Sequence, residues 1–277
     1  MKEGVFDEVL DFEHMYQAYK MTSKNKRTKV EAIDFTLNLS RNLWKIIDEL
    51  QTRTYQVGGY YRFMIYDPKK REIQAQSFRD RVVQHWLCDN ILRDHLERRL
   101  IYDNAACRLG KGTHFAMDRL TYFLREHYKK HGSGGYILKY DIAHYFDSID
   151  HEVLKELLKG IEDKAVLGLL HHIINSYEKE PDKGLPMGNQ TSQWFALFYL
   201  NPLDRLIKEK MRIKHYIRYM DDGIIVHESK ESLQVTLVEM EKMAEKLKLS
   251  FNAKTQIFPI REGVDFLGFR FYLSNTG

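Results

Sequence analysis

Three aspartates lie where the sequence predicts strand ends, a placement that suits divalent-metal chemistry. Asp141 follows the apolar run YILKY, and Asp221 and Asp222 lie between the runs HYIRYM and GIIVHE. Carboxylates crowded at a tight turn repel one another, and a bound cation would relieve that repulsion. Two Mg²⁺ ions about 4 Å apart can stabilise the attacking and leaving oxygens when a hydroxyl displaces pyrophosphate from a nucleotide. An isolated Asp-Asp pair is more often an ordinary hairpin turn, so the flanking residues decide between a metal site and a turn.

The elements around these aspartates predict an α+β fold with a mostly antiparallel sheet backed by helices. HYIRYM and GIIVHE predict a hairpin with the acidic residues at its tip. Strand-like runs elsewhere are YYRFMIYD and REIQAQSF, joined by the turn DPKK, and then YILKYDI, SFNA, QIFPI and VDFLGFRFYL. Helical periodicity predicts helices over 30–50, 79–100, 114–129, 151–159, 164–177, 190–210 and 230–248. Pro202 should kink or divide the helix over 190–210.

The composition indicates a folded protein made of one large domain or two tightly joined subdomains. The chain has 277 residues, of which 43% are hydrophobic and 13% aromatic, and its net charge is +4. Cys88 and Cys107 match neither a CxxC pair nor a zinc site, so both are interpreted as packing residues. The N-terminus carries several acids, and no stretch approaches the ~20 apolar residues of a membrane span. We therefore expect a cytoplasmic protein with no signal peptide and no membrane contact.

The motifs around the aspartates resemble those of reverse transcriptases, and they occur in that family's order over about residues 55–275. Tyr219-Met220-Asp221-Asp222 resembles the YxDD box, and LKYDIAHYFDSIDHEVL (138–154) resembles the motif of the first catalytic aspartate. The remaining matches are RFMIYDPKKREIQAQSFRDRVVQHWL (62–87), GLPMGNQTSQWFALFYLNPLDRLI (184–207), FNAKTQIF (251–258) and VDFLGF (264–269). The resemblance implies the fingers and palm of a right-hand polymerase and RNA-directed DNA synthesis.

The resemblance also implies a division of the chain. Residues 1–54 would form an N-terminal helical extension, 55–135 the fingers and 136–277 the palm, with 160–183 as an insertion near the fingers. The chain ends a few residues after VDFLGF, so we expect a thumb that is either absent from the natural enzyme or truncated from this chain. Without a thumb, we expect weak and poorly processive synthesis by the isolated chain, which a partner should rescue.

Within this family, the chain most resembles the reverse transcriptases of diversity-generating retroelements. The residues that carry this likeness are TSQ within GNQTSQ, the run ACRLGKGTH (106–114) and the pattern from DPKKREI to FRDRVV. Group II intron and retron enzymes generally have glutamine at the position of Met187, before the glycine of the loop motif. They usually have alanine at the position of Met220, in the YxDD box. The likeness implies error-prone copying of a template-repeat RNA into cDNA, with a small basic accessory protein as partner.

The family pattern assigns roles to residues of the expected catalytic centre. Asp141, Asp221 and Asp222, with the neighbouring Ile142, would hold two Mg²⁺ ions, for which Mn²⁺ can substitute. Lys254 would protonate the leaving pyrophosphate; otherwise it is a surface residue. Phe146 matches a steric gate against ribonucleotides, although its position alone would favour a core aromatic.

Other residues would bind the incoming dNTP, the template RNA and the primer or cDNA. On the fingers turn, Lys69 and Arg71, with Lys70 between them, would clamp the triphosphate, although such turns are usually only solvated. Met187 would line the nucleotide site, and Gly188 would let the backbone approach the base pair. The expected nucleic-acid contacts are Arg108, Lys111, Ser192 and Gln193, with His114 beside them. The basic segment MTSKNKRTK (21–29) is either a solvated loop or a further nucleic-acid contact.

Two alternatives to a mutagenic retroelement polymerase stay open. The first is a phage-defence reverse transcriptase with the same fold, which a missing template repeat in the neighbouring genes would favour. The second is a non-catalytic RNA-binding scaffold derived from this fold. The intact set of three aspartates argues against a scaffold.

Overall fold

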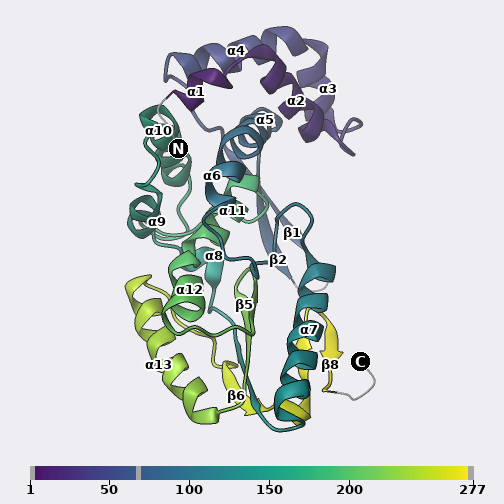
Figure 1. The fold of residues 1–277 in the computed structure, drawn as a ribbon. Coiled ribbons are helices and arrows are strands. Elements are labelled where there is room, and N and C mark those ends of the chain that lie inside the picture. The colour runs from purple at the N-terminus through teal and green to yellow at the C-terminus, as the bar shows by residue number, and fades with distance from the viewer. Residues whose placement is uncertain (1–3, 67–69, 274–277) are drawn as a thin grey trace. The chain divides into compact units, whose positions relative to one another are not determined.

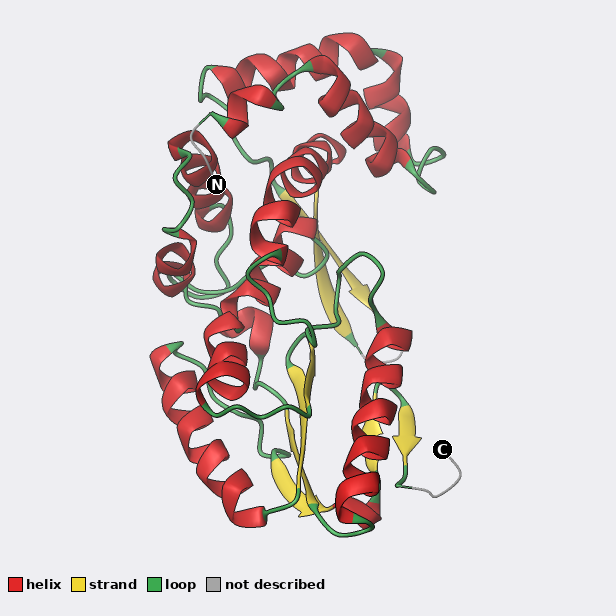
Figure 2. Ribbon diagram, viewed as in Figure 1, coloured by secondary structure: helices red, strands yellow, loops and turns green. Residues whose placement is uncertain are grey.

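The computed structural model describes residues 4–66 and 70–273. The chain divides into two compact units. Unit 1 is built from residues 1–98 and 149–195, and unit 2 from residues 99–148 and 196–277. Helix and sheet occur in both units, as expected for an α+β chain (Figures 1 and 2). No helix among the described residues is long and apolar enough to cross a membrane.

Unit 1 is mainly helical, with one two-stranded hairpin. Its elements are α1 (Val5–Glu8), α2 (Phe12–Ser23), α3 (Val30–Leu37), α4 (Leu39–Gln51), β1 (Tyr60–Ile65), β2 (Arg71–Gln76), α5 (Phe78–Leu87), the π-helix η1 (Cys88–Leu92), α6 (Arg93–Glu97), α9 (His151–Leu158), α10 (Lys164–Asn175) and the first part of α11 (Gln190–Tyr199).

Local signals explain where several helices of unit 1 begin. Asp11 caps α2 by accepting a hydrogen bond from His14 N, and Ser77 caps α5 by accepting from Asp80 N. Asp163 caps α10 and also accepts from Phe6 N at 2.9 Å. The helix expected over 30–50 is two helices, because the backbone leaves the helical region at Asn38, where φ is −123°.

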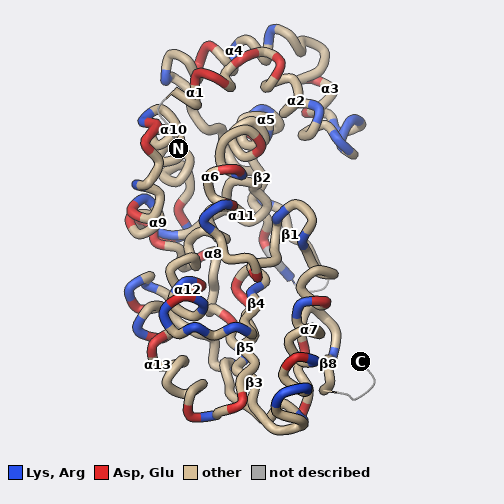
Figure 3. Tube along the Cα trace, viewed as in Figure 1, with Lys and Arg blue, Asp and Glu red and all other residues tan. Residues whose placement is uncertain are grey.

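The packed side of α5 forms the centre of unit 1. Val82, Val83 and Trp86 are fully buried, and α2 packs against this helix. Trp86 Nε1 also donates to Val9 O at 2.7 Å, which satisfies its buried N–H. The basic residues after α2, Lys24 to Lys29, are exposed and form the blue turn beside the α2 label in Figure 3.

Unit 2 contains a four-stranded antiparallel sheet. Its elements are α7 (Thr113–His131), β3 (Tyr136–Tyr140), α8 (Tyr145–Ser148), α12 (Asn201–Arg205), the π-helix η2 (Leu206–Lys210), β4 (Tyr216–Tyr219), β5 (Asp222–His227), α13 (Lys230–Lys246), β6 (Gln256–Pro259), the 3₁₀ helix η3 (Ile260–Glu262), β7 (Val264–Phe266) and β8 (Phe269–Phe271). The sheet order is β4-β5-β3-β6, and β7 and β8 form a separate hairpin. As expected, Pro202 divides the long helix: α11 ends at Tyr199, and Pro202 stands in the first turn of α12.

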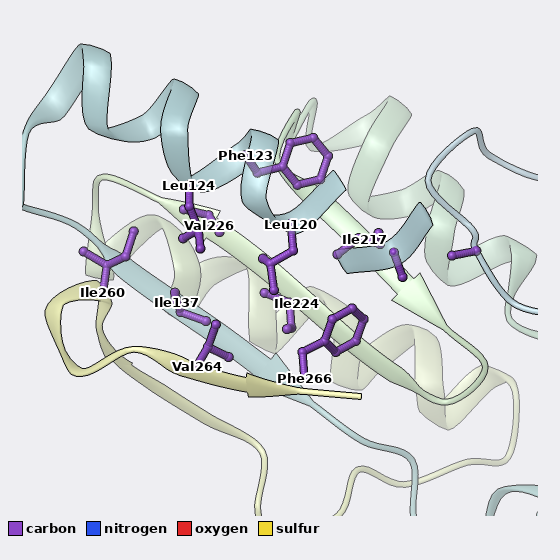
Figure 4. Packing of buried hydrophobic residues seen from close by; sticks show 12 residues of the cluster. Leu120, Phe123, Leu124, Ile137, Ile217, Ile224, Val226, Ile260, Val264 and Phe266 are labelled. Carbon is purple, nitrogen blue, oxygen red and sulfur yellow. The ribbon is translucent and has the colours of Figure 1, made fainter. Parts of the chain in front are cut away.

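Helices cover both faces of this sheet, which explains why its strands are apolar on both sides. On one face α7 packs against β4 and β5, and on the other α13 packs against β3, β5 and β6. Figure 4 shows Leu120, Phe123 and Leu124 of α7 above strand residues such as Ile137 and Ile224. Val264 and Phe266 close the same cluster, which holds β7 against the sheet.

Two strand predictions in the last part of the chain were wrong. SFNA forms no strand; Phe251 makes only an isolated bridge with Ile142. VDFLGFRFYL is not one strand but the β7–β8 hairpin, because Leu267 and Gly268 both have positive φ, 52° and 86°. Two consecutive positive φ values give the tight turn that suits the twist of a hairpin.

Candidate active site

The strand register brings the three aspartates to one end of the sheet in unit 2. In the antiparallel pair of β3 and β5, Tyr140 is opposite Gly223. Extending this register by one residue places Asp141, just after β3, opposite Asp222, the first residue of β5. Tyr219 pairs with Asp222, so Met220 and Asp221 form the two-residue turn between β4 and β5. The predicted hairpin with acidic residues at its tip is therefore confirmed.

The structure disfavours the charged form of the Asp222 carboxylate. Its side chain is 26% exposed, and Lys139 Nζ lies 3.9 Å from its Oδ2. Burial raises the pKa of Asp222 to about 6 despite the opposing charge of Lys139, and the charges of Asp141 and Asp221 raise it further. Its Oδ1 atom is buried and has no hydrogen-bond partner among the described residues.

These residues fit a pair of divalent cations. Mg²⁺ takes oxygen ligands, usually a few carboxylates together with water and substrate phosphates. The unpartnered Oδ1 of Asp222 is such an oxygen, and a cation there would favour the charged carboxylate, which burial and the neighbouring aspartates disfavour. Asp141, opposite Asp222 in the register, and Asp221, beside it in the turn, are half-buried at the same end of the sheet.

Without metal, Asp222 should destabilise the fold near neutral pH, so Asp222→Asn is expected to stabilise the metal-free protein. The folded state holds the proton of this carboxyl up to about pH 6, whereas its ordinary pKa is 3.8. The folded state thus binds more protons, and the destabilisation grows from about pH 4 to 6 and is complete above pH 6. In EDTA at pH 7.5, urea denaturation should show a gain on the order of 2 kcal/mol for Asp222→Asn.

The gain should vanish below about pH 4, where the wild-type carboxyl is protonated in both states. Asp118→Asn, which removes an exposed charge from α7 in the same unit, is the control and should change little. An equal stability of wild type and Asp222→Asn at pH 7.5 would show that the folded state does not raise the pKa of Asp222.

A buried ion pair anchors the turn that carries Asp221. Arg218 and Asp204 are both fully buried, with Arg218 Nε 2.7 Å from Asp204 Oδ1 and Nη2 2.6 Å from Oδ2. Arg218 Nη1 donates to Met220 O in the turn at 2.6 Å. Burial alone would lower the pKa of Arg218, but the Asp204 carboxylate outweighs it and raises the pKa above its usual value. The guanidinium therefore stays charged and fixes the turn.

Tyrosines extend this network under the sheet. Tyr216 OH donates to Asp204 Oδ1 at 2.6 Å, and Tyr140 OH lies 2.6 Å from Tyr216 OH. Gly223 leaves room for Tyr140, because a Cβ at this position would lie 2.3 Å from its ring. The turn itself is unusual, since Met220 has φ +54°. A left-handed non-glycine residue persists only where neighbouring contacts hold it, and the Arg218 bond to Met220 O is such a contact.

The segment 250–254 runs beside the residues that follow Asp141. Ala143 N donates to Ser250 O at 2.9 Å, and Asn252 N donates to Asp141 O at 2.7 Å. The side chain of Ile142 is buried hydrocarbon without a ligand atom, so the expected metal ligand at this position would be its backbone carbonyl. Lys254 is exposed two residues after Asn252, whose Oδ1 accepts from its N–H. The structure thus brings Lys254 into the neighbourhood of Asp141, while its role as an acid stays a prediction.

Phe146 lies on the short helix α8 that follows Asp141. It is half-buried and packs edge-on against Tyr145, with ring centroids 5.9 Å apart. Tyr145 is fixed by the hydrogen bond from its OH to Ala196 O at 2.5 Å. Phe146 is therefore neither a fully buried core residue nor a loose surface residue, which suits a gate.

The remaining expected nucleotide contacts lie in unit 1. Gln74 N of β2 donates to Met187 O at 3.3 Å, which ties this loop to the hairpin. Gly188 has φ +109°, and a Cβ there would lie 3.1 Å from Ile73. Glycine is thus favoured here mainly by the left-handed backbone, and a side chain would also press on Ile73. Lys69 lies outside the described residues, Lys70 is exposed, and Arg71 begins β2 with a side chain that is not described.

The residues expected to contact nucleic acid differ in their burial and in their hydrogen bonds within the protein. Ser192 is buried in α11, whereas Gln193 is half-buried beside it. Arg108 of unit 2 donates to Ile101 O at 2.8 Å and to Asn104 O at 3.0 Å, so it stabilises its own loop. Lys111 donates to Tyr102 O and lies over the Tyr102 ring at 4.3 Å. Their contact with nucleic acid stays a prediction.

Three residues of the site have no counterpart among the expected ones. These are Arg218, Asp204 and Lys139, which the network above assigns to the support of the aspartates. The signal for two of them was present in the sequence. Lys139 and Arg218 are charged residues inside otherwise apolar strands, and such a charge requires a partner.

Comparisons with known proteins agree with this geometry. The family model of the reverse transcriptase (RNA-dependent DNA polymerase) matches residues 67–271. No curated protein sequence matches the chain. Telomerase from Candida albicans in complex with a TWJ fragment of telomeric RNA is similar with a TM-score of 0.60 and 14% identity, covering 82% of this chain and 49% of that one.

A second similar structure is apo telomerase from Candida tropicalis, truncated from its C-terminal domain. It has a TM-score of 0.55 and 16% identity, and the match covers 72% of this chain and 50% of that one. At such identities the likeness shows the fold alone, and this chain spans about half the length of those structures. The family model covers more than half of the chain and includes all three aspartates, so the chain belongs to the reverse transcriptase family.

Proposed function

We propose that this protein is an RNA-directed DNA polymerase that extends a primer on an RNA template. The main support for the proposal is that the strand register places Asp141, Asp221 and Asp222 at the same end of an antiparallel sheet. The unpartnered buried oxygen of Asp222 supports a metal role for this group. We assign the palm to unit 2, which carries the aspartates, and the fingers to unit 1, which carries the β1–β2 hairpin.

Each residue then has a chemical task. Asp141, Asp221 and Asp222 would hold two Mg²⁺ ions, which supply charge stabilisation at the attacking and leaving oxygens. Phe146 would exclude the 2′-hydroxyl of a ribonucleotide, and Lys254 would donate a proton to the departing pyrophosphate. Arg218 does not touch substrate; it holds the turn at Met220 O so that Asp221 keeps its position.

The proposal is tested by extension of an oligo(dT) primer on poly(rA) by the purified chain. We expect dTTP incorporation with Mg²⁺ or Mn²⁺ and none in EDTA. Binding of the primed template without incorporation under any divalent ion would instead favour the RNA-binding scaffold.

Sugar selection gives a further prediction. Phe146→Ala should raise the relative incorporation of GTP over dGTP at least tenfold, because the ring would no longer fill the space of the 2′-hydroxyl. Single-nucleotide extension with each substrate measures this ratio. Phe269→Ala, which removes an exposed phenylalanine from β8, is the control. A ratio that stays unchanged in Phe146→Ala would make Phe146 a packing residue.

We further propose that the polymerase belongs to the diversity-generating retroelement type and copies a template-repeat RNA with many errors. The residues that support this are TSQ (191–193), the run ACRLGKGTH (106–114) and Met187. Met187 is half-buried, and its backbone carbonyl accepts a hydrogen bond from Gln74 N of β2. A small basic accessory protein would be the partner, in keeping with the modest net charge of +4.

The substitution Met187→Gln should lower misincorporation several-fold, most of all opposite template adenine. Methionine offers no polar check on the base pair, whereas an amide leaves unpaired groups when a mismatch forms. Sequencing of cDNA made by both proteins on one RNA template gives the error spectra. Met21→Gln, at an exposed methionine, should keep the wild-type spectrum. Equal spectra for Met187→Gln and wild type would contradict the role of Met187.

A further inference from the structure

Unit 1 contains a second cluster of metal-ligating side chains, formed by His151, Glu178 and Asp182. A ring nitrogen of His151 and one carboxylate oxygen from each acid all lie within 4.8 Å of one another. His151 is the first residue of α9, and the two acids lie on the turn 176–184 that follows α10. None of these residues belongs to the aspartate site of unit 2.

The state of His151 points to a ligand. Its side chain is fully buried, and its Nε2 lies 2.8 Å from Gly184 O. A carbonyl can only accept, so Nε2 carries the proton and Nδ1 carries the free electron pair. Nδ1 is buried and has no hydrogen-bond partner among the described residues. A carbonyl bond to one imidazole nitrogen, with the other nitrogen left free, is the arrangement of a metal-binding histidine.

The turn that carries the two acids is well fixed to α9. His151 N donates to Asp182 O at 2.9 Å, and Gly184 N donates to Ile149 O at 2.8 Å. Within the turn, Lys179 N donates to Lys183 O at 2.8 Å. Gly184 has φ +99°, and a Cβ there would lie 2.7 Å from Lys179 Cβ. The carboxylates are therefore exposed side chains on a defined backbone next to a buried imidazole.

We propose that His151, Glu178 and Asp182 form a binding site for a transition-metal ion, with Zn²⁺ as the favoured species. One imidazole nitrogen and two carboxylate oxygens suit Zn²⁺, which commonly takes three protein ligands and a water. Mg²⁺ would prefer the all-oxygen aspartate site instead. Ligand atoms up to 4.8 Å apart need to move inward to meet one ion, and exposed carboxylates can do so.

The ion would cross-link the turn to the N-terminal end of α9. The turn leads directly into Leu185 to Gly188, the loop that Gln74 N holds at Met187 O. Bound Zn²⁺ should therefore stabilise this part of unit 1 and leave the chemistry of the aspartates unchanged.

The test uses the full chain and Zn²⁺, with affinity measured by competition against a chromophoric chelator. Glu178→Gln and Asp182→Asn remove one ligand each at exposed positions, and Asn tolerates the φ of +57° at residue 182. Both variants should bind at least tenfold more weakly and lose one bound ion per chain. Glu180→Gln is the matched control, since Glu180 is an exposed acid of the same turn outside the cluster.

A rise of the melting temperature with Zn²⁺ should occur in the wild type and in Glu180→Gln but not in the two ligand variants. Wild-type affinity in both ligand variants would overturn the site. An equal loss in Glu180→Gln would also overturn it, because the acids would then act only through their summed charge. Neither outcome depends on polymerase activity, so the result is separate from the proposed function.

Discussion

Asp221→Asn is expected to lower RNA-templated primer extension on the order of 10³-fold or more, while the fold and RNA affinity stay near those of the wild type. An amide cannot supply the negative charge that a divalent ion requires. Asp221 is half-buried in the two-residue turn between β4 and β5, and asparagine fits such turns as well as aspartate does. The loss should therefore come from the metals and not from misfolding.

Extension rates and RNA affinity, measured on the same preparations, check this expectation. Asp118→Asn on α7 is the matched control, because it removes one exposed carboxylate from the same unit. Raised Mg²⁺ or Mn²⁺ should not restore Asp221→Asn to the wild-type rate. Near wild-type extension by Asp221→Asn would show that the metals bind elsewhere.

The second large effect concerns the buried pair of Arg218 and Asp204. Asp204→Asn should lower the free energy of unfolding by about 3–5 kcal/mol, because it leaves the Arg218 charge buried without its counter-charge. Both side chains are fully buried, and Arg218 makes two bonds to the Asp204 carboxylate. Urea denaturation measures the loss. A loss below about 1 kcal/mol, the value of an exposed pair, would contradict the burial of this pair.

The paired change Arg218→Met with Asp204→Leu separates stability from positioning. Replacing both charges by apolar groups should restore most of the stability. It should not restore extension, since the bond from Arg218 Nη1 to Met220 O is lost and the turn of Asp221 is no longer fixed. We expect a stable protein with activity at least tenfold below the wild type. Wild-type extension by the paired variant would mean that Arg218 supports only the fold.

The sequence predicted secondary-structure elements correctly where neighbouring residues carry the signal. Two short apolar runs on either side of Asp221 and Asp222 predicted the hairpin, and the ring of Pro202 predicted the division of the long helix. The apolar run over 264–273 led to the prediction of a single strand. The turn at Leu267 and Gly268 lies inside this run and was therefore missed. The break at Asn38 was also missed, since one residue outside the helical region leaves the helical period almost unchanged.

The residues that support the aspartates make contacts between distant parts of the chain, which local sequence patterns cannot predict. Lys139 donates to Asp265 O, 126 residues away in the chain, while its charge lies near Asp222. Asn104 pairs with Arg218 at the edge of β4, so the loop around Arg108 covers that edge. Such pairings follow from sheet order and register, which the chain sets through its whole core.

The most direct test of the metal assignment is anomalous diffraction from crystals of the protein with a primed RNA template, a non-hydrolysable dNTP analogue and Mn²⁺. The account predicts two Mn²⁺ peaks roughly 4 Å apart, both in contact with carboxylates of the set Asp141, Asp221 and Asp222. Peaks held by other residues, or a nucleotide bound there with no ion at these three aspartates, would contradict it.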